Sequence, residues 1–290
     1  MRTPPQVMPA IITPFTAAGE VDESAHEANV ARLWTLGVHG VVIGGSNGEG
    51  PYLEPGERRR LATLARRATP DGFVMVGLAA ESLRAAWAMA AEAAEAGADA
   101  VLVITPTTLV RHRDDLVEGF FSDLADASPL PLFLYSVPKV TGYELPVEVA
   151  LRLATHPNVV GMKDSGGDPL RAVAINSAAP SGFWMFAGAS AAVAAAVAGG
   201  VHGAVTASAN YAPALLAAVV AAAGTPEADP LHERLLRLSA AVESHGVAGV
   251  KHAATRTGLA GGATRRPLRP LDATALAAID AALAEAGLTV

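Results

Sequence analysis

The chain contains no cysteine, which excludes disulfide bonds and thiolate metal sites. Charged residues make up only 17% of its 290 residues, and the formal net charge is -7. The basic residues are scattered, and their one run, at residues 58–60, is expected on a solvated helix face. We therefore expect no nucleic-acid partner, which needs a basic surface. The N-terminus lacks the apolar core of a signal peptide, so a cytoplasmic protein is expected.

Metal-ligand spacings and long apolar runs are also missing. None of the eight histidines forms the His-x-x-x-His spacing of a helical metal site. The alanine-rich segment at residues 187–223 is interrupted by polar residues and proline, and it lacks the roughly 20 uninterrupted apolar residues of a membrane helix. We therefore expect no metal, no organic cofactor and no membrane partner.

Short apolar runs alternate eight times with segments of helical periodicity. Continuous apolar runs of this kind are typical of parallel strands that are covered on both faces. Eight strand–helix units predict an α/β fold, a (β/α)8 TIM barrel, with its active site where the strands end. The expected strands are residues 7–15, 40–45, 73–78, 100–104, 131–135, 159–163, 183–186 and 203–207.

The barrel is expected to occupy residues 1–225, and residues 226–290 are expected to form a C-terminal helical appendage packed on it. The alternative is a doubly wound open sheet. That fold is disfavoured because no glycine fingerprint follows the first expected strand.

Lys163 stands at the C-terminal end of the sixth expected strand. Burying an unpaired ammonium group is costly, so burial favours the neutral amine, which a carbonyl substrate can trap as a Schiff base. The alternative is a structural lysine that reaches the surface or pairs with a carboxylate such as Asp164.

Other polar residues follow the expected strands and are expected to meet at one mouth of the barrel. Tyr135 precedes Lys163 by one strand–helix repeat, so the two should be lateral neighbours. A phenol beside such a lysine can move protons, although a core tyrosine is the alternative. The glycine-rich loop at residues 44–50 can present N–H groups and a hydroxyl to an anion, or it can be only a turn.

Three motifs resemble the dihydrodipicolinate synthase / N-acetylneuraminate lyase family of class I, pyruvate-handling aldolases. They are Gly-Ser-Asn-Gly-Glu at residues 45–49, Tyr-Ser-Val-Pro at residues 135–138 and Gly-Met-Lys-Asp-Ser-Gly-Gly at residues 161–167. The similarity runs nearly end to end and is closest to the 4-hydroxy-2-oxoglutarate aldolase branch. The resemblance implies a homotetramer, a dimer of dimers, that binds pyruvate.

The resemblance also implies residue roles. Lys163 forms the Schiff base and Tyr135 moves protons, while the expected substrate-binding residues are Ser46, Asn47, Ser165 and Val205. Two positions depart from the family. Thr108 stands where members usually carry a relay tyrosine, and Val140 stands where the synthases carry an arginine that clamps a carboxylate. Lys139 offers only a point charge in its place.

The expected reaction is therefore cleavage of a 4-hydroxy-2-oxo acid, such as 4-hydroxy-2-oxoglutarate, to pyruvate and an aldehyde. One alternative is dihydrodipicolinate synthesis by condensation of pyruvate with aspartate semialdehyde, which Val140 disfavours. Another is aldol cleavage or dehydration of a 2-keto-3-deoxy sugar acid. A non-catalytic barrel that binds a 2-oxo acid also stays open, because Thr108 is a poor replacement for a tyrosine relay.

Overall fold

The computed structural model describes residues 2–288 of the chain. Its eight parallel strands form one sheet in the order β1-β8-β7-β6-β5-β4-β3-β2. A parallel bridge between Ala10 and Val42 joins the two ends of this order, so the barrel predicted from the sequence is confirmed. The strands are β1 (Val7–Pro9), β2 (Gly40–Ile43), β3 (Phe73–Leu78), β4 (Ala100–Ile104), β5 (Leu132–Ser136), β6 (Val159–Asp164), β7 (Trp184–Ala187) and β8 (Gly203–Thr206).

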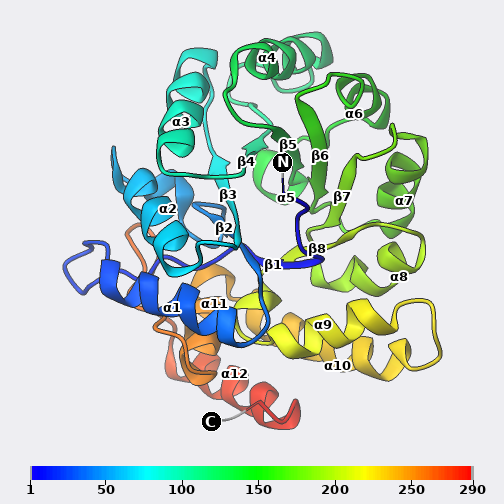
Figure 1. Ribbon diagram of the computed structural model, residues 1–290. Coiled ribbons are helices and arrows are strands. Elements are labelled where there is room, and N and C mark those ends of the chain that lie inside the picture. The colour runs from blue at the N-terminus through cyan, green and yellow to red at the C-terminus, as the bar shows by residue number, and fades with distance from the viewer. Residues whose placement is uncertain (1, 289–290) are drawn as a thin grey trace.

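Helices surround the strands as a ring (Figure 1). Several begin at a residue whose side chain accepts a hydrogen bond from the first turn, as Asp22, Ser82 and Asp168 do. The helices of the ring are α1 (Glu23–Thr35), α2 (Glu57–Ala68), α3 (Leu83–Glu95), α4 (Asp114–Ala127), α6 (Val147–Leu153), α7 (Pro169–Ala178), α8 (Val193–Ala198) and α9 (Pro213–Ala222). Shorter turns are η1 (Gly50–Tyr52), α5 (Pro138–Thr141), η2 (Ser190–Ala192) and η3 (Ser208–Asn210).

Three more helices follow the ring: α10 (Ala228–Glu243), α11 (Gly246–Arg256) and α12 (Ala273–Glu285). They pack on one another, and α10 also packs against α9 and η2 (Figure 1). We propose that the barrel ends at residue 225 and the helical appendage begins at residue 226, within the turn between α9 and α10.

The first strand is shorter than the sequence predicts, because it ends at Pro9 and not at residue 15. The chain then leaves the sheet. The Ile12 N–H donates to the Asn210 side chain at 3.0 Å, and Phe15 bridges to Ala263. Ile11 and Ile12 are fully buried although they lie outside the strand, so hydrophobicity did not mark its end.

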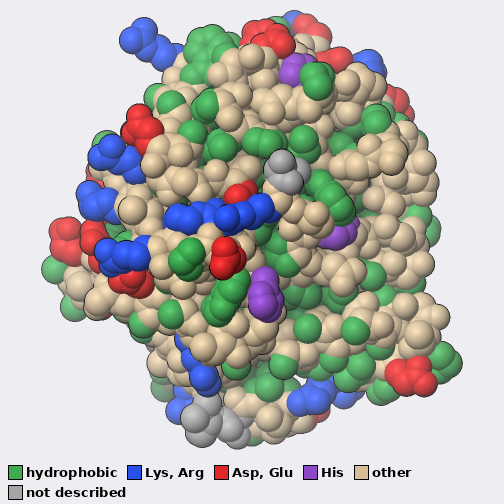
Figure 2. All heavy atoms as spheres, viewed as in Figure 1, with side chains coloured by type: hydrophobic (Ala, Val, Ile, Leu, Met, Phe, Trp, Pro, Cys, Tyr) green, Lys and Arg blue, Asp and Glu red, His purple; other side chains and the backbone are tan. Residues whose placement is uncertain are grey.

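On the face shown in Figure 2, basic and acidic side chains lie close together. Arg66 pairs with Asp99 at 2.5 Å, and Arg60 pairs with Glu23 at 3.0 Å. No helix between residues 2 and 288 has the length and apolar character needed to cross a membrane. A cytoplasmic location stays a prediction.

The barrel interior is packed with large side chains and has no spare room beside the lysine strand. Phe133, Phe186 and Met75 are among the interior residues and are fully buried. A Cβ atom added at Gly161 of β6 meets Cε1 of Phe133 at 2.3 Å and the Trp184 carbonyl oxygen at 2.4 Å. One partner of this clash is backbone, so the strands themselves have to shift.

We expect Gly161→Ala to lower the free energy of unfolding by about 1–3 kcal/mol, the usual cost of overpacking a core. Urea unfolding followed by circular dichroism measures the loss. Gly119→Ala in α4 is the matched control, because an added Cβ there meets nothing within 4 Å. It should be neutral or slightly stabilising, since alanine favours a helix over glycine. Equal urea midpoints for Gly161→Ala and Gly119→Ala contradict the view that an added Cβ at residue 161 overpacks the core.

Candidate active site

Lys163 lies at the end of β6 and its side chain enters the barrel. The residue is 5% exposed, it is paired in register with Tyr135 of β5, and its Nζ lies 4.4 Å from the centroid of the Tyr135 ring. Asp164 does not neutralise it. The Asp164 carboxylate instead accepts hydrogen bonds from Arg171 Nε and from the Gly166 N–H, both at 2.7 Å. Across residues 2–288, Lys163 takes part in no salt bridge, so its amine is available for chemistry.

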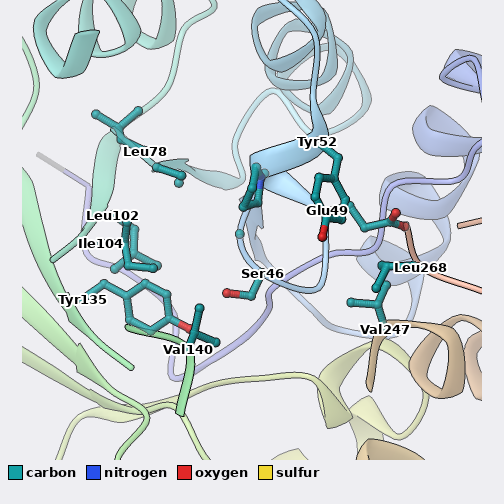
Figure 3. A pocket seen from close by; sticks show the side chains of 15 residues that line it. Ser46, Glu49, Tyr52, Leu78, Leu102, Ile104, Tyr135, Val140, Val247 and Leu268 are labelled. Atoms are coloured by element: carbon teal, nitrogen blue, oxygen red, sulfur yellow. The ribbon is translucent and has the colours of Figure 1, made fainter. Parts of the chain in front are cut away.

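Tyr135 has a phenol that is suited to exchanging protons. Burial alone raises the pKa of Tyr135, but the charge of Lys163 and the nearby Ser46 hydroxyl outweigh burial and lower it. The Tyr135 carbonyl accepts hydrogen bonds from the Thr105 N–H and hydroxyl at 3.2 and 3.0 Å, which fixes the end of β5. In Figure 3 the Ser46 hydroxyl is directed toward Tyr135.

Ser165 adds a buried hydroxyl that lies beside Tyr135 and contributes to the lowered pKa of its phenol. Gly188, which directly follows β7, leaves the space that this hydroxyl and the lysine occupy. A Cβ atom at Gly188 lies 2.0 Å from Ser165 Oγ and 2.8 Å from Lys163 Cε. Gly188 was not identified from the sequence, where it is one glycine after a strand among 28 in the chain.

Arg58 of α2 holds the loop at residues 44–50 in place. This side chain donates hydrogen bonds to the carbonyls of Gly44 at 3.1 Å, Gly77 at 2.6 Å and Gly50 at 2.8 Å. Arg58 is only 7% exposed, and burial lowers its pKa to about 10. The expectation that residues 58–60 form a solvated face is therefore wrong for Arg58, because the loop carbonyls need its donors.

The C-terminal region also holds this loop, through contacts with Glu49. Glu49 adopts a left-handed conformation with φ of 54° and is buried. One carboxylate oxygen lies 2.5 Å from Lys251 Nζ of α11, and the other accepts the Arg265 N–H at 2.8 Å. Lys251 also donates to the Ala263 carbonyl at 2.5 Å. Burial lowers the pKa of Lys251, and Glu49 opposes this shift.

A cavity of about 250 Å³ opens beside Tyr135 and Ser46. Its other walls are mostly apolar and include Leu78, Leu102, Ile104, Val140, Val247 and Leu268 (Figure 3). Lys163 is not among the lining residues, but Tyr135, whose ring it contacts, is one of them.

Five of the expected site residues do not line this cavity: Lys163, Ser165, Val205, Asn47 and Thr108. Val205 is buried in the barrel interior, in the same cluster as Tyr135 and Phe186. Asn47 is half-buried in the loop. Thr108 is exposed after β4, where its N–H donates to Glu81 at 2.9 Å.

Glu243, at the end of α10, was missed because its helix was assigned to the appendage. Its carboxylate accepts hydrogen bonds from the hydroxyls of Ser190 and Tyr211, both at 2.9 Å. The Ser190 hydroxyl also lies 2.9 Å from that of Ser208. Burial raises the pKa of Glu243, while the two hydrogen bonds and the charge of Lys163 act against this rise.

We expect Lys251→Met to lower the free energy of unfolding by about 3–5 kcal/mol, because it leaves the Glu49 carboxylate buried without its cation. Urea unfolding measures the effect. The double variant Glu49→Gln/Lys251→Met should recover much of the loss. Arg113→Met, which breaks an exposed pair with Asp115, should leave the midpoint unchanged. Wild-type stability of Lys251→Met contradicts the structural role of this pair.

The chain matches a family model described as the dihydrodipicolinate synthetase family over residues 3–286. It is 34% identical over 283 residues to 4-hydroxy-tetrahydrodipicolinate synthase 1 of Streptomyces coelicolor, which covers 95% of this chain and 92% of that protein. Identity to a 4-hydroxy-tetrahydrodipicolinate synthase of Hyphomonas neptunium is 37% over 289 residues, covering 97% and 98% of the two chains.

A similar solved structure is the chloride-inhibited dihydrodipicolinate synthase of Acinetobacter baumannii in complex with pyruvate. It has a TM-score of 0.93 and 30% identity, and the match covers 99% of this chain and 100% of that one. Both the family model and the curated relatives extend over nearly the whole sequence. The chain therefore belongs to the dihydrodipicolinate synthetase family.

Proposed function

We propose that this protein is a class I lyase that binds pyruvate as a Schiff base on Lys163 and joins it reversibly to an aldehyde. The observation that carries the proposal is a buried strand-end lysine without a salt bridge among residues 2–288, with Nζ 4.4 Å from the centroid of a tyrosine ring. The chain belongs to a family of class I, pyruvate-dependent lyases, and a solved relative binds pyruvate.

In the cleavage direction, the amine of Lys163 attacks C2 of the 2-oxo acid, and loss of water gives an iminium ion. The C1 carboxylate is bound by Ser46, Asn47 and Ser165. Val205 lines the pyruvate site from the barrel interior. The Tyr135 phenolate takes the proton of the C4 hydroxyl. The C3–C4 bond then breaks, its electron pair passes to the iminium, and an enamine and an aldehyde result. Protonation at C3 and hydrolysis release pyruvate and restore Lys163.

The names of the relatives support condensation of pyruvate with aspartate semialdehyde better than cleavage of 4-hydroxy-2-oxoglutarate. Both reactions use the same enamine, and in condensation its C3 carbon attacks the aldehyde. Val140 weighs against the synthase reaction because it cannot bind a second carboxylate. Thr108 stands in place of a relay tyrosine and weighs against a full proton relay. It therefore supports a second candidate function, a non-catalytic barrel that binds a 2-oxo acid.

Incubation with pyruvate and borohydride should add the mass of reduced pyruvate to Lys163, as peptide mass spectrometry can measure. The chain has only three lysines, so exposed Lys139 and buried Lys251 are internal controls and should stay unlabelled. Label on Lys163→Ala equal to that on the wild type, or no label at all, contradicts the proposal.

Tyr135→Phe separates binding from turnover in the same experiment. It should keep part of the borohydride trapping while turnover falls by about 10²–10⁴-fold, the usual contribution of general acid–base catalysis. A pyruvate-release assay with 4-hydroxy-2-oxoglutarate and a condensation assay with aspartate semialdehyde measure turnover. Trapping without turnover of these substrates and of uncharged aldehydes in the wild type favours the non-catalytic candidate.

We also propose a homotetramer built as a dimer of dimers. Apolar side chains near β4 lie exposed in the single chain, with Leu109 91% exposed and Leu116 of α4 44% exposed, which supports a contact there. Light scattering at micromolar concentration should give about four times the chain mass of 29.4 kDa. The mass of a monomer contradicts this assembly.

A further inference from the structure

We infer that the aldehyde used by this site carries an apolar substituent in place of a second carboxylate. The inference rests on the proposed function and extends it to the substrate class. It is carried by the cavity beside Tyr135, whose walls hold no cation that is free to bind an anion.

The position of the cavity assigns it to the aldehyde part of the substrate. Carbon C2 of the bound 2-oxo acid is attached to Lys163, which does not line the cavity. Tyr135, which exchanges a proton with the C4 oxygen in the proposed reaction, does line it. Ser46, which binds the C1 carboxylate in the proposed reaction, stands at one edge of this space, and the substrate chain beyond C4 extends past Tyr135 toward its apolar walls.

The walls beyond Tyr135 come from three parts of the fold and are apolar. Leu102 and Ile104 belong to β4, Val140 belongs to α5, and Val247 and Leu268 come from the C-terminal region (Figure 3). An apolar cavity of about 150 Å³ is large enough to bind benzene. The volume of about 250 Å³ found here therefore has room for a branched alkyl or phenyl group.

No lysine or arginine is among the lining residues, and the charges closest to the loop are already paired. Glu49 is the one charged lining residue, and its two oxygens are bound by Lys251 and the Arg265 N–H. The guanidinium group of Arg58 binds three backbone carbonyls. Lys139, next to Val140, is exposed and does not line the cavity. A substrate carboxylate in this cavity therefore loses its hydration without gaining a counter-ion from the walls, which disfavours glyoxylate and aspartate semialdehyde.

A matched pair of aldehydes tests the inference. Succinic semialdehyde and 4-methylpentanal have the same number of non-hydrogen atoms, and an isopropyl group in the second replaces the carboxylate of the first. The rate of pyruvate consumption in condensation gives kcat/KM for each. We expect 4-methylpentanal to be favoured by at least about tenfold, because burying methyl groups in an apolar pocket discriminates on this scale.

Val140→Arg introduces a guanidinium group at the cavity wall and should reverse this preference by favouring succinic semialdehyde. Leu170→Arg on α7 is the control, because Leu170 is 77% exposed and does not line the cavity. It should leave the ratio of the two kcat/KM values unchanged. A Val140→Arg ratio equal to that of the control overturns the inference.

The outcomes also separate the inference from the function on which it rests. If borohydride does not attach pyruvate to Lys163, both are overturned. If Lys163 is labelled but succinic semialdehyde is the better substrate, or 4-methylpentanal does not react, only the apolar specificity is overturned. Labelling of Lys163 together with a preference for 4-methylpentanal supports both.

Discussion

Buried charges, rather than apolar contacts, hold the loop at residues 44–50 in the shape on which the candidate site depends. The loop carbonyls cannot pair within the sheet, and they need other donors once water is excluded. Arg58 supplies two of these hydrogen bonds from one side, to Gly44 and Gly50, and a third to the Gly77 carbonyl of β3. From the other side, Lys251 binds Glu49, while Arg265 binds Glu57 through a two-point contact at 2.5 and 2.6 Å. The barrel and the C-terminal helices therefore form the site together.

Most of the barrel could be predicted because its signals are local. Continuous apolar runs mark parallel strands wherever they occur, and the predicted bounds of β3 and β4 agree with the structure. One strand–helix repeat between Tyr135 and Lys163 was enough to predict that they are neighbours. The end of β1 could not be predicted, because residues 10–15 stay buried after they leave the sheet.

The rest of the candidate site depends on contacts between residues far apart in the sequence. Glu49 and Lys251 look like ordinary surface charges when each is considered with its neighbours in the chain. Arg58 stands in a run of three arginines, and helical periodicity did not reveal that this member of the run turns inward. Family resemblance assigned roles to Lys163 and the residues around it, but it says little about Glu243 or the apolar cavity walls, where relatives can differ.

The pair between Glu49 and Lys251 also determines when the loop at residues 44–50 can take its final shape during synthesis of the chain. A chain that grows from its N-terminus makes Glu49 early, and 201 further residues are added before Lys251. At usual rates of translation this interval lasts about 10–40 s. The loop at residues 44–50 therefore cannot form this contact, and with it the shape described above, before α11 has been synthesised.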